Sequence, residues 1–340
     1  MRQSPSTPLT SLDPAKPARV VFMGTPDFAV PSLRALVAAT APGVIWPGGV
    51  DIVGVITRPD RPAGRGRQVA HSPVKQFALS AALPVYQPGS LRRPEAQRQL
   101  EALTPNLIVV AAFGQILPPE ILRLPTRGCL NVHASLLPRW RGASPVAAAI
   151  RAGDTETGVT IMAMDEGLDT GAIIAARATP IGPEETAGAL TSRLAELGAS
   201  LLVATLPAWL EGSARLTPQD ESRATLTRPL RKEDGRLDWT RSADELSRVV
   251  RAMTPWPGAF TTWNGKLLKV LEAAPIPRTG GGAPGACYLT PPGTPDGPLA
   301  CVCGEGALAL RVIQLEGKRA LTSADALRGH PGLSAAILGQ

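Results

Sequence analysis

The segment Arg19-Val-Val-Phe-Met-Gly-Thr-Pro-Asp-Phe-Ala29 joins a short apolar run to a glycine turn. The run predicts a buried strand over 19–24. Apolar residues at helical spacing over 27–39, with Pro31 near the first turn, predict a helix directly after it. The alternation continues with strands predicted at 51–57, 106–112 and 128–133, and a helix at 94–103. Strands that alternate with helices predict a doubly wound, Rossmann-like α/β sheet, in which ligands bind at the carboxyl ends of the strands.

The chain changes in character after a long helix, rich in Ala and Leu, that is predicted at 184–210. Beyond residue 237, short strands separated by Gly and Pro turns predict a small, OB-like β-barrel. The Gly- and Pro-rich segment 280–298 is expected to be a mobile surface insertion. Further strands are predicted at 155–164, 172–178, 260–263, 267–271, 299–303 and 308–315, and a further helix at 242–251.

These changes of composition also predict the domain organisation. Residues 1–18 are rich in Ser, Thr and Pro and are expected to form a disordered tail. We expect a catalytic domain at 19–210 and a small C-terminal domain at 228–340. The polar, irregular residues 211–227 are expected to be the linker between them.

The composition of the chain indicates which classes of protein are excluded and which kind of partner is expected. The length of 340 residues suits about two domains, and a hydrophobic content of 44% excludes a wholly disordered chain. Lys and Arg number 35 against 28 Asp and Glu, and residues 223–340 contain 15 of the basic and 10 of the acidic residues. A basic excess of this kind suits an anionic partner such as nucleic acid or an acidic membrane.

Cysteine and histidine are scarce. Four cysteines are too few for a disulfide scaffold: Cys129 and Cys287 stand alone in the sequence, and Cys301 and Cys303 form a C-x-C pair. With three histidines in the chain, no zinc site is expected. No uninterrupted apolar run reaches the ~18–20 residues of a membrane helix, and the N-terminal segment lacks the apolar core of a secretory signal. We therefore expect a cytoplasmic protein with no metal and no membrane attachment.

The candidate chemistry begins at the predicted strand 128–133, which ends with Asn131 and His133. Residues two apart in a strand share a face, so an amide and an imidazole are expected side by side at the carboxyl end of the sheet. An amide can donate to an oxygen that becomes negative, and a histidine can carry a proton near neutral pH. Together they suit attack on a carbonyl group, although a structural Asn beside a hydrogen-bonded core His would give the same pattern.

A carboxylate near His133 would strengthen the catalytic interpretation. The segment Met164-Asp-Glu-Gly-Leu-Asp-Thr-Gly171 offers Asp165 and Asp169 between two predicted strands. Either aspartate could orient the imidazole, and either could instead cap a turn. The first glycine turn does not support NAD binding, because Gly24 is followed by Thr, Pro, Asp, Phe and Ala29 where a dinucleotide site has G-x-G-x-x-G.

From about Arg19 onward the chain resembles the bacterial methionyl-tRNA formyltransferase family. The pattern Asn-x-His followed by Ser-Leu-Leu-Pro is highly specific to transferases that use formyl-tetrahydrofolate. The matching stretches are Phe22–Ala29, Arg58–Arg67, Asn131–Gly142, Gly158–Met162, Asp169–Gly171, Lys232–Trp239 and Trp256–Thr261.

The resemblance implies transfer of the formyl group of 10-formyltetrahydrofolate to the α-amino group of initiator methionyl-tRNA. It implies that Asn131 holds the formyl oxygen and that His133 is a proton carrier and electrostatic stabiliser. It further implies that Asp169 positions His133 or an ordered water and assists proton transfer. It also implies a folate-binding segment and wall formed by Ser135, Leu136, Leu137, Pro138, Phe113 and Gly114. The chain has Phe113 where the family often has tyrosine, and Ala134 where it often has glycine.

Basic residues are the candidates for contact with tRNA. The loop with Arg61, Arg65 and Arg67 would by composition alone be a solvated surface loop, with Lys75 nearby. The resemblance implies instead that it enters the acceptor-stem end of the tRNA, with Arg65 as the residue to single out. The C-terminal domain is expected to contact the tRNA backbone, and its candidates are Lys266, Lys269, Lys318 and Arg319. The tryptophans at 239, 256 and 263 are expected in the core, and the protein is expected to be monomeric.

Two alternatives stay open at this point. A glycinamide-ribonucleotide or sugar-amine formyltransferase would share Asn131, His133 and the acidic partner, but would not need the arginine loop. A catalytically silent RNA-binding protein would need the basic surfaces alone. The presence of Asn131, His133 and Asp169 is an argument against a protein without catalytic activity.

Overall fold

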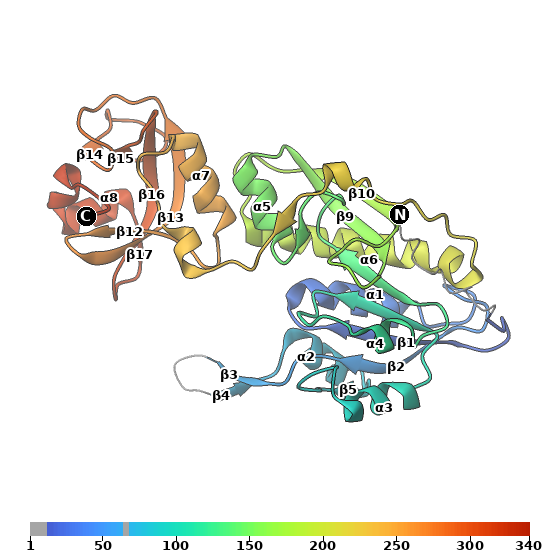
Figure 1. The fold of residues 1–340 in the computed structure, drawn as a ribbon. Helices are drawn as coiled ribbons and strands as arrows, with labels where there is room; N and C mark the ends of the chain where they lie inside the picture. The colour runs from blue at the N-terminus through green and yellow to red at the C-terminus, as the bar shows by residue number, and fades with distance from the viewer. Residues whose placement is uncertain (1–11, 64–67) are drawn as a thin grey trace. The chain divides into compact units, whose positions relative to one another are not determined.

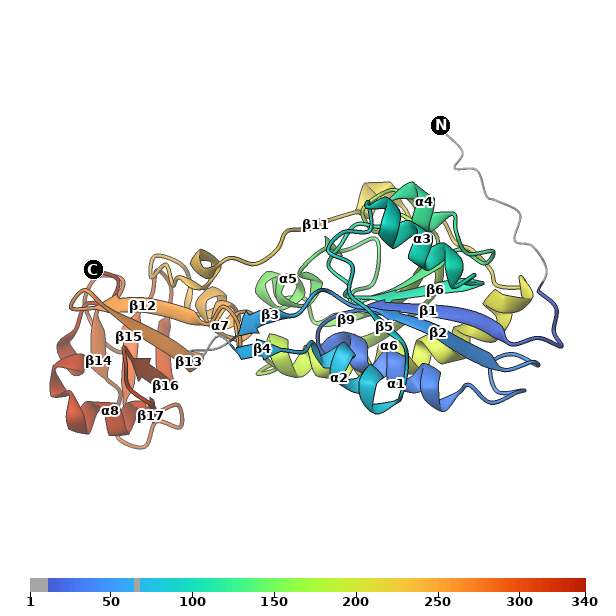
Figure 2. The ribbon, with the colours of Figure 1, turned by 90° about the horizontal axis from the view of Figure 1, so that it is seen from below.

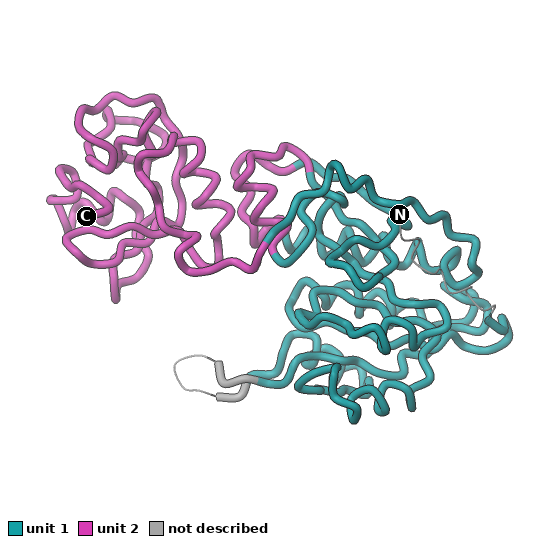
Figure 3. The backbone as a smooth tube through the Cα atoms, viewed as in Figure 1, with its two compact units in different colours: residues 1–143, 157–180, 191–227 teal, residues 144–156, 181–190, 228–340 magenta. Residues whose placement is uncertain are grey.

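The computed structural model describes residues 12–63 and 68–340, apart from the side chains of residues 61–63, 68 and 69. The chain divides into two compact units (Figure 3). Unit 1 comprises residues 1–143, 157–180 and 191–227, and unit 2 comprises residues 144–156, 181–190 and 228–340. The candidate catalytic residues all belong to unit 1.

Unit 1 is built on a seven-stranded sheet of order β10-β9-β7-β6-β1-β2-β5 (Figure 1). The strands β5, β2, β1, β6 and β7 pair in parallel, and β9 pairs antiparallel to β7. The strand bounds are β1 Ala18–Gly24, β2 Val50–Ile56, β5 Val85–Tyr86, β6 Leu107–Ala111, β7 Cys129–His133, β9 Glu156–Ala163 and β10 Ile173–Pro180.

Helices cover both faces of this sheet. In Figure 2, α3 and α4 lie on one face, and α1, α2 and α6 lie on the other. All five residues of β6 are buried, as expected for a central parallel strand that packs on both sides. The doubly wound α/β fold predicted from the sequence is confirmed. The helix bounds are α1 Val30–Ala38, α2 Pro73–Ser80, α3 Pro94–Ala102, α4 Pro119–Leu122 and α6 Ala187–Glu211, with a 3-10 turn η1 at Asp27–Ala29.

The helix α6 is, in the part of the chain that the structure describes, the one helix that by length and composition could cross a membrane. Arg193 and Glu196 interrupt its apolar sequence, and half of its most apolar stretch is buried inside the protein. A Cβ atom at Gly198 would lie 2.8 Å from Val132 and 3.2 Å from Val159. This close approach to β7 and β9 is that of a core helix packed on a sheet.

Unit 2 contains a curled antiparallel sheet of order β12-β13-β16-β15-β14, with β17 paired to β16. The prediction of a small antiparallel β-domain after a helix is confirmed. The bounds are α5 Pro145–Ala152, η3 Lys232–Gly235, α7 Ala243–Ala252, β12 Ala259–Trp263, β13 Lys266–Ile276, β14 Cys287–Leu289, β15 Leu299–Val302, β16 Ala307–Leu315, β17 Ala320–Thr322 and α8 Ser323–Gly329, followed by a 3-10 turn η4 at Pro331–Ala335.

The structure corrects the prediction for the segment 280–298. This segment contains β14, and Cys287 forms a disulfide with Cys301 across the ladder between β14 and β15. Cys287 is therefore not an isolated cysteine. The two residues are direct partners in the register, which brings their side chains together. Sequence spacing does not reveal this register. Cys129 and Cys303 are free and buried.

The division of the chain also differs from the expected domain boundaries. The expected linker 211–227 groups with unit 1, where β11 (Leu226–Thr227) pairs in parallel with β8 (Arg141–Gly142). Of the expected tail, residues 1–11 lie outside the described part, and the indole of Trp46 donates to the Lys16 carbonyl at 3.0 Å. Polar composition concealed these contacts because the residues 16, 226 and 227 take part in them through backbone groups.

The prediction that three tryptophans are core residues holds for one of them and is wrong for Trp256. Trp239 is buried, and its indole donates to the hydroxyl of Thr261. Trp263 is half-buried and packs edge-on against His330. Trp256 lies in the turn between α7 and β12 and is 56% exposed.

Candidate active site

The carboxyl end of β7 places Asn131 and His133 on one face, and both reach the same carboxylate. The Asn131 amide Nδ2 donates to Asp169 Oδ1 at 3.3 Å. The His133 Nδ1 atom lies 3.6 Å from Asp169 Oδ2, and His133 is 5% exposed. The structure thus brings together the three residues that the sequence analysis singled out for chemistry.

The other ring nitrogen of His133 identifies the tautomer. His133 Nε2 lies 3.0 Å from the carbonyl oxygen of Trp140. A carbonyl oxygen only accepts, so Nε2 must carry the hydrogen in this contact. The Nδ1 atom, which faces Asp169, is therefore the acceptor nitrogen of the neutral ring. Asp169 is placed to pair with the protonated ring.

Asp169 is held in an unusual backbone conformation by its neighbours. Its φ of +53° lies in the left-handed region, which Asp tolerates better than most residues. The Gln219 amide donates to the carbonyl oxygens of Asp169 at 2.8 Å and Gly171 at 2.7 Å. A Cβ atom at Gly171 would lie 1.7 Å from the Ala163 carbonyl oxygen, so no other residue fits there. The backbone amide of Gly142 completes the site by donating to Asp169 Oδ2 at 2.8 Å.

The structure distinguishes the two candidate aspartates. The Asp165 carboxylate accepts from the backbone amide of Gly167 at 3.0 Å and from the hydroxyl of Thr170 at 2.6 Å. Both donors lie in the same turn, so Asp165 caps that turn. Asp169 is the residue that contacts His133.

The segment after β7 is fixed by backbone and hydroxyl contacts. The Ser135 hydroxyl donates to the Arg139 carbonyl at 2.6 Å. The Thr160 hydroxyl donates to the Ser135 carbonyl at 2.7 Å and accepts from the Leu137 amide at 3.1 Å. The Trp140 amide donates to the Thr225 hydroxyl at 2.7 Å. These contacts set the position of the Trp140 carbonyl that His133 contacts.

The residues expected to bind folate divide into two groups by exposure. Gly114 is exposed and has a φ of +77°, and Leu136 and Pro138 are partly exposed. Ser135, Leu137 and Phe113 are buried. Phe113 packs in the core cluster with residues of β1 and β6. The first group can offer surface to a ligand, and the second group supports that surface from below.

Sequence reasoning missed three residues that shape this site, because all lie in the expected linker. They are Gln219, Glu221 and Thr225. Arg141 is 3% exposed and donates to Gln219 Oε1 and to both carboxylate oxygens of Glu221. The Glu221 carboxylate raises the pKa of Arg141, and the same contact lowers the pKa of Glu221. No local pattern marks these residues, since each acts on a segment about 50 to 85 residues away.

The arginine loop forms a two-stranded hairpin. The strands β3 (Arg61–Ala63) and β4 (Gln68–Ala70) pair antiparallel and extend from unit 1 (Figures 1 and 2). Arg65 and Arg67 lie outside the described residues, and Arg61 is described by its backbone alone. The expected roles of these three arginines therefore stay predictions.

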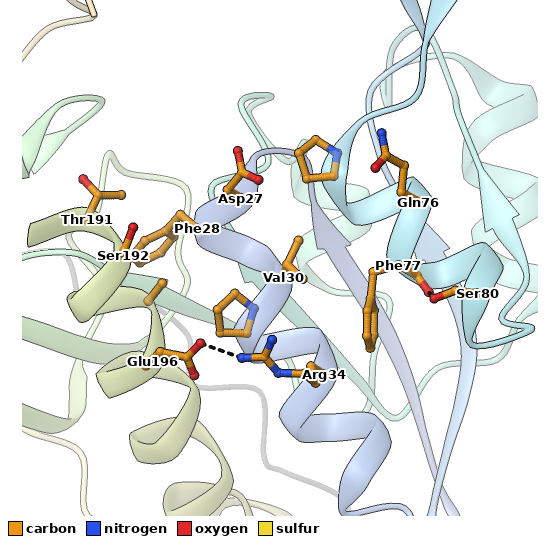
Figure 4. Close-up of a pocket in the computed structure, with 13 residues that line it drawn as sticks. Asp27, Phe28, Val30, Arg34, Gln76, Phe77, Ser80, Thr191, Ser192 and Glu196 are labelled. Atoms are coloured by element: carbon orange, nitrogen blue, oxygen red, sulfur yellow. Dashed lines mark hydrogen bonds and ion pairs between the residues drawn. The ribbon is translucent and has the colours of Figure 1, made fainter. Parts of the chain in front are cut away.

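A cavity of about 540 Å³ lies elsewhere in unit 1, among η1, α1, α2 and α6 (Figure 4). Phe28 and Phe77 line it, together with an ion pair of 2.5 Å between Arg34 and Glu196. Of the predicted catalytic and folate-binding residues, all of which the structure describes, none lines this cavity.

Comparison with known proteins identifies both parts of the chain. The formyl transferase family model matches residues 18–206, and the model of the formyl transferase C-terminal domain matches residues 229–331. The chain is 49% identical to the methionyl-tRNA formyltransferase of Myxococcus xanthus (strain DK1622), over 92% of this chain and 95% of that protein. It is 46% identical to the methionyl-tRNA formyltransferase of Marinobacter nauticus (strain ATCC 700491 / DSM 11845 / VT8), over 92% of this chain and 96% of that protein.

Solved structures show the same fold at lower identity. The sugar 3N-formyltransferase WlaRD, solved in the presence of dTDP and 5-N-formyl-THF, matches with a TM-score of 0.61 at 17% identity, over 89% of this chain and 99% of that one. HypX from Aquifex aeolicus in complex with tetrahydrofolic acid matches with a TM-score of 0.57 at 18% identity, over 91% of this chain and 46% of that one. The sequence relatives and the family models together show that this chain belongs to the methionyl-tRNA formyltransferase family.

Proposed function

We propose that this protein transfers the formyl group of 10-formyltetrahydrofolate to the α-amino group of initiator methionyl-tRNA. The observation that carries the proposal is the joining of Asn131 and His133 through the Asp169 carboxylate at the carboxyl end of β7. An amide donor, a proton carrier and a fixed carboxylate are the groups that acyl transfer to an amine requires. Membership of the family supports this reaction over others that use the same groups.

Asn131 is proposed to stabilise the formyl oxygen as it gains negative charge. Its Nδ2 atom carries two hydrogens, and one of them is directed at Asp169. That contact fixes the plane of the amide and directs the second hydrogen elsewhere. A donor that is already oriented before reaction costs no reorganisation when charge develops.

His133 and Asp169 are proposed to assist the transfer of the proton that leaves the amine. A bond forms between the amine nitrogen and the formyl carbon, and the bond from that carbon to N10 of the folate breaks. One proton leaves the amine, and one is delivered to the departing nitrogen. The Nδ1 atom of His133 is the ring position that can carry this proton, and Asp169 pairs with the charged ring while it does so.

The surface offered by Gly114, Leu136 and Pro138 is proposed to hold the folate, with Ser135, Leu137 and Phe113 supporting it from below. The Arg61, Arg65 and Arg67 hairpin and the basic C-terminal domain are proposed to bind the tRNA backbone. We further propose that the enzyme acts in the cytoplasm as a monomer, without metal and without attachment to a membrane.

The test of this function is transfer of labelled formyl from 10-formyltetrahydrofolate to methionyl-initiator tRNA, with methionyl-elongator tRNA as control. We expect transfer to the initiator alone. Transfer to a sugar amine or to glycinamide ribonucleotide, with none to tRNA, would contradict the proposal. Tight tRNA binding without any transfer would favour a silent RNA-binding protein.

The substitution Gln219→Met is expected to lower kcat with little change in either KM. It removes the amide that bridges the carbonyls of Asp169 and Gly171, together with the oxygen that accepts from Arg141, but keeps the length of the side chain. Both contacts are partly buried, and a typical intramolecular hydrogen bond contributes about 0.5–1.5 kcal/mol, so we expect a loss of about tenfold in kcat. Steady-state kinetics with thermal denaturation measure both effects. A kcat equal to that of the wild type would exclude a positioning role for Gln219.

The substitution Arg65→Ala is expected to raise the KM for methionyl-tRNA while the KM for the folate stays unchanged. Loss of one phosphate contact should also reduce the salt dependence of tRNA binding by about one unit of slope. Arg98→Ala is the matched control, because Arg98 is a 67% exposed arginine on α3 that pairs with Glu95. Equal losses for tRNA and folate would count against this role of Arg65.

A further inference from the structure

A hydrogen-bonded cluster lies at the base of the β3–β4 hairpin. Asp60 directly precedes β3, His71 directly follows β4, Lys75 lies on α2 and Gln87 directly follows β5. Asp60 Oδ2 accepts from Lys75 Nζ at 2.5 Å and lies 2.9 Å from His71 Nδ1. Asp60 Oδ1 accepts from Gln87 Nε2 at 2.9 Å, and Gln87 Oε1 accepts from Lys75 Nζ at 2.7 Å. We call Asp60, His71, Lys75 and Gln87 the hairpin clamp.

The ion pair between Lys75 and Asp60 at the centre of the clamp is shielded from solvent and balanced in charge, whereas the His71 side chain is 47% exposed. The side chains of Lys75 and Asp60 are 15% and 16% exposed. Hydrogen bonds from Lys75 and then from Gln87 lower the pKa of the Asp60 carboxyl to about 2, so the carboxylate stays charged at neutral pH. The charge of Lys75 is therefore neutralised by Asp60 within the protein. A phosphate that approached Lys75 would have to compete with a fixed carboxylate at 2.5 Å.

A second set of contacts ties the same two chain segments together. The hydroxyls of Thr57 and Ser72 lie 2.8 Å apart, one before the hairpin and one after it. Ser72 also accepts from the Lys75 backbone amide and so caps α2. Gln87 Nε2 donates to the carbonyl oxygen of Arg58 at 2.8 Å. Both ends of the hairpin are thus attached to the sheet and to α2.

We propose that Asp60, Lys75 and Gln87 are positioning residues that fix the basic hairpin for productive binding of methionyl-tRNA, and that Lys75 is not itself a ligand of the tRNA phosphates. The inference rests on the proposed role of the hairpin arginines in tRNA binding. It assigns a structural role to Lys75. A count of basic residues in the sequence would instead have suggested that Lys75 binds phosphate. A hairpin that carries several phosphate ligands needs a fixed base, because small displacements of binding groups cost large factors in rate.

The test compares Lys75→Met with Arg65→Ala, with Arg98→Ala as the control for loss of a surface charge. For Lys75→Met we expect the KM for methionyl-tRNA to rise about 10- to 100-fold, with the KM for folate and the kcat at saturating tRNA unchanged. The slope of log Kd for methionyl-tRNA against log salt should equal that of the wild type, whereas Arg65→Ala should lower it by about one. Asp60→Asn should show the same KM effect in a smaller degree, and it keeps the inference testable if Lys75→Met does not fold.

Each outcome has one meaning. A salt slope reduced as much by Lys75→Met as by Arg65→Ala would make Lys75 a phosphate ligand and overturn the inference. An unchanged KM for tRNA in both clamp variants, with Arg65→Ala still impaired, would overturn the inference and leave the proposed function standing. If the KM for tRNA were unchanged in Arg65→Ala as well as in both clamp variants, the proposed role of the hairpin in tRNA binding would itself be wrong. Partial recovery in the double variant Asp60→Asn/Lys75→Met, which leaves no unpaired carboxylate, would support the clamp.

Discussion

The substitution Asn131→Ala is expected to lower kcat for formyl transfer by about 10²–10³, the usual cost of losing one preorganised oxyanion donor. Asn131 is held by Asp169 at 3.3 Å, so its amide is already oriented before the reaction begins. The effect should fall on kcat far more than on either KM, because the donor acts on charge that develops during the reaction. Single-turnover transfer of labelled formyl at saturating substrates measures it.

A second variant, Asn131→Asp, distinguishes the role of the amide as a hydrogen-bond donor from the role of the side chain in packing. Asn131→Asp keeps the shape of the side chain but replaces its donor with a carboxylate next to Asp169. We expect its kcat to be at least as low as that of Asn131→Ala, because the two adjacent carboxyls would share a proton between them and offer no donor to the formyl oxygen. An Asn131→Ala enzyme with wild-type kcat, or an Asn131→Asp enzyme more active than Asn131→Ala, would contradict the role of the amide.

The substitution Asp169→Asn is expected to lower kcat by about 10²–10⁴, the range that proton-transfer catalysis contributes. The carboxylate accepts from two donors, Asn131 Nδ2 and the Gly142 amide. An amide offers one oxygen in place of two, so one of those donors would face an NH₂ group. The change also removes the negative charge that faces His133 Nδ1 at 3.6 Å.

Asp165→Asn is the matched control for this prediction. Asp165 lies in the same glycine-rich segment, but it accepts from Gly167 and Thr170 within its own turn. We expect Asp165→Asn to change stability slightly and kcat less than about tenfold. If Asp165→Asn lost as much activity as Asp169→Asn, the two aspartates would act through the same turn and the specific pairing with His133 would be wrong.

The fold of the catalytic unit could be predicted from local patterns. The five buried residues of β6 and the apolar run of β1 appear in the sequence as short continuous segments, since strands covered on both faces need no polar side. The placement of Asn131 and His133 on one face follows from the period of two residues in a strand. The pairing of Cys287 with Cys301 and the exposure of Trp256 could not be predicted, because each depends on the register or turn that surrounds it.

The sequence by itself determined the α/β alternation, the small antiparallel domain and the position of an amide and an imidazole at the end of β7. These features follow from side-chain burial and backbone sterics within a few residues. The residue pattern left Asp165 and Asp169 both open as partners of His133, and the family resemblance favoured Asp169. The tertiary structure showed that Asp169 lies against His133, that Gln219 holds this aspartate and that Lys75 is neutralised by Asp60. Asp169 lies 38 residues from Asn131 and 50 from Gln219, and Lys75 lies 15 from Asp60. Contacts over such separations are selected by the packing of whole elements, which no short segment of the sequence specifies.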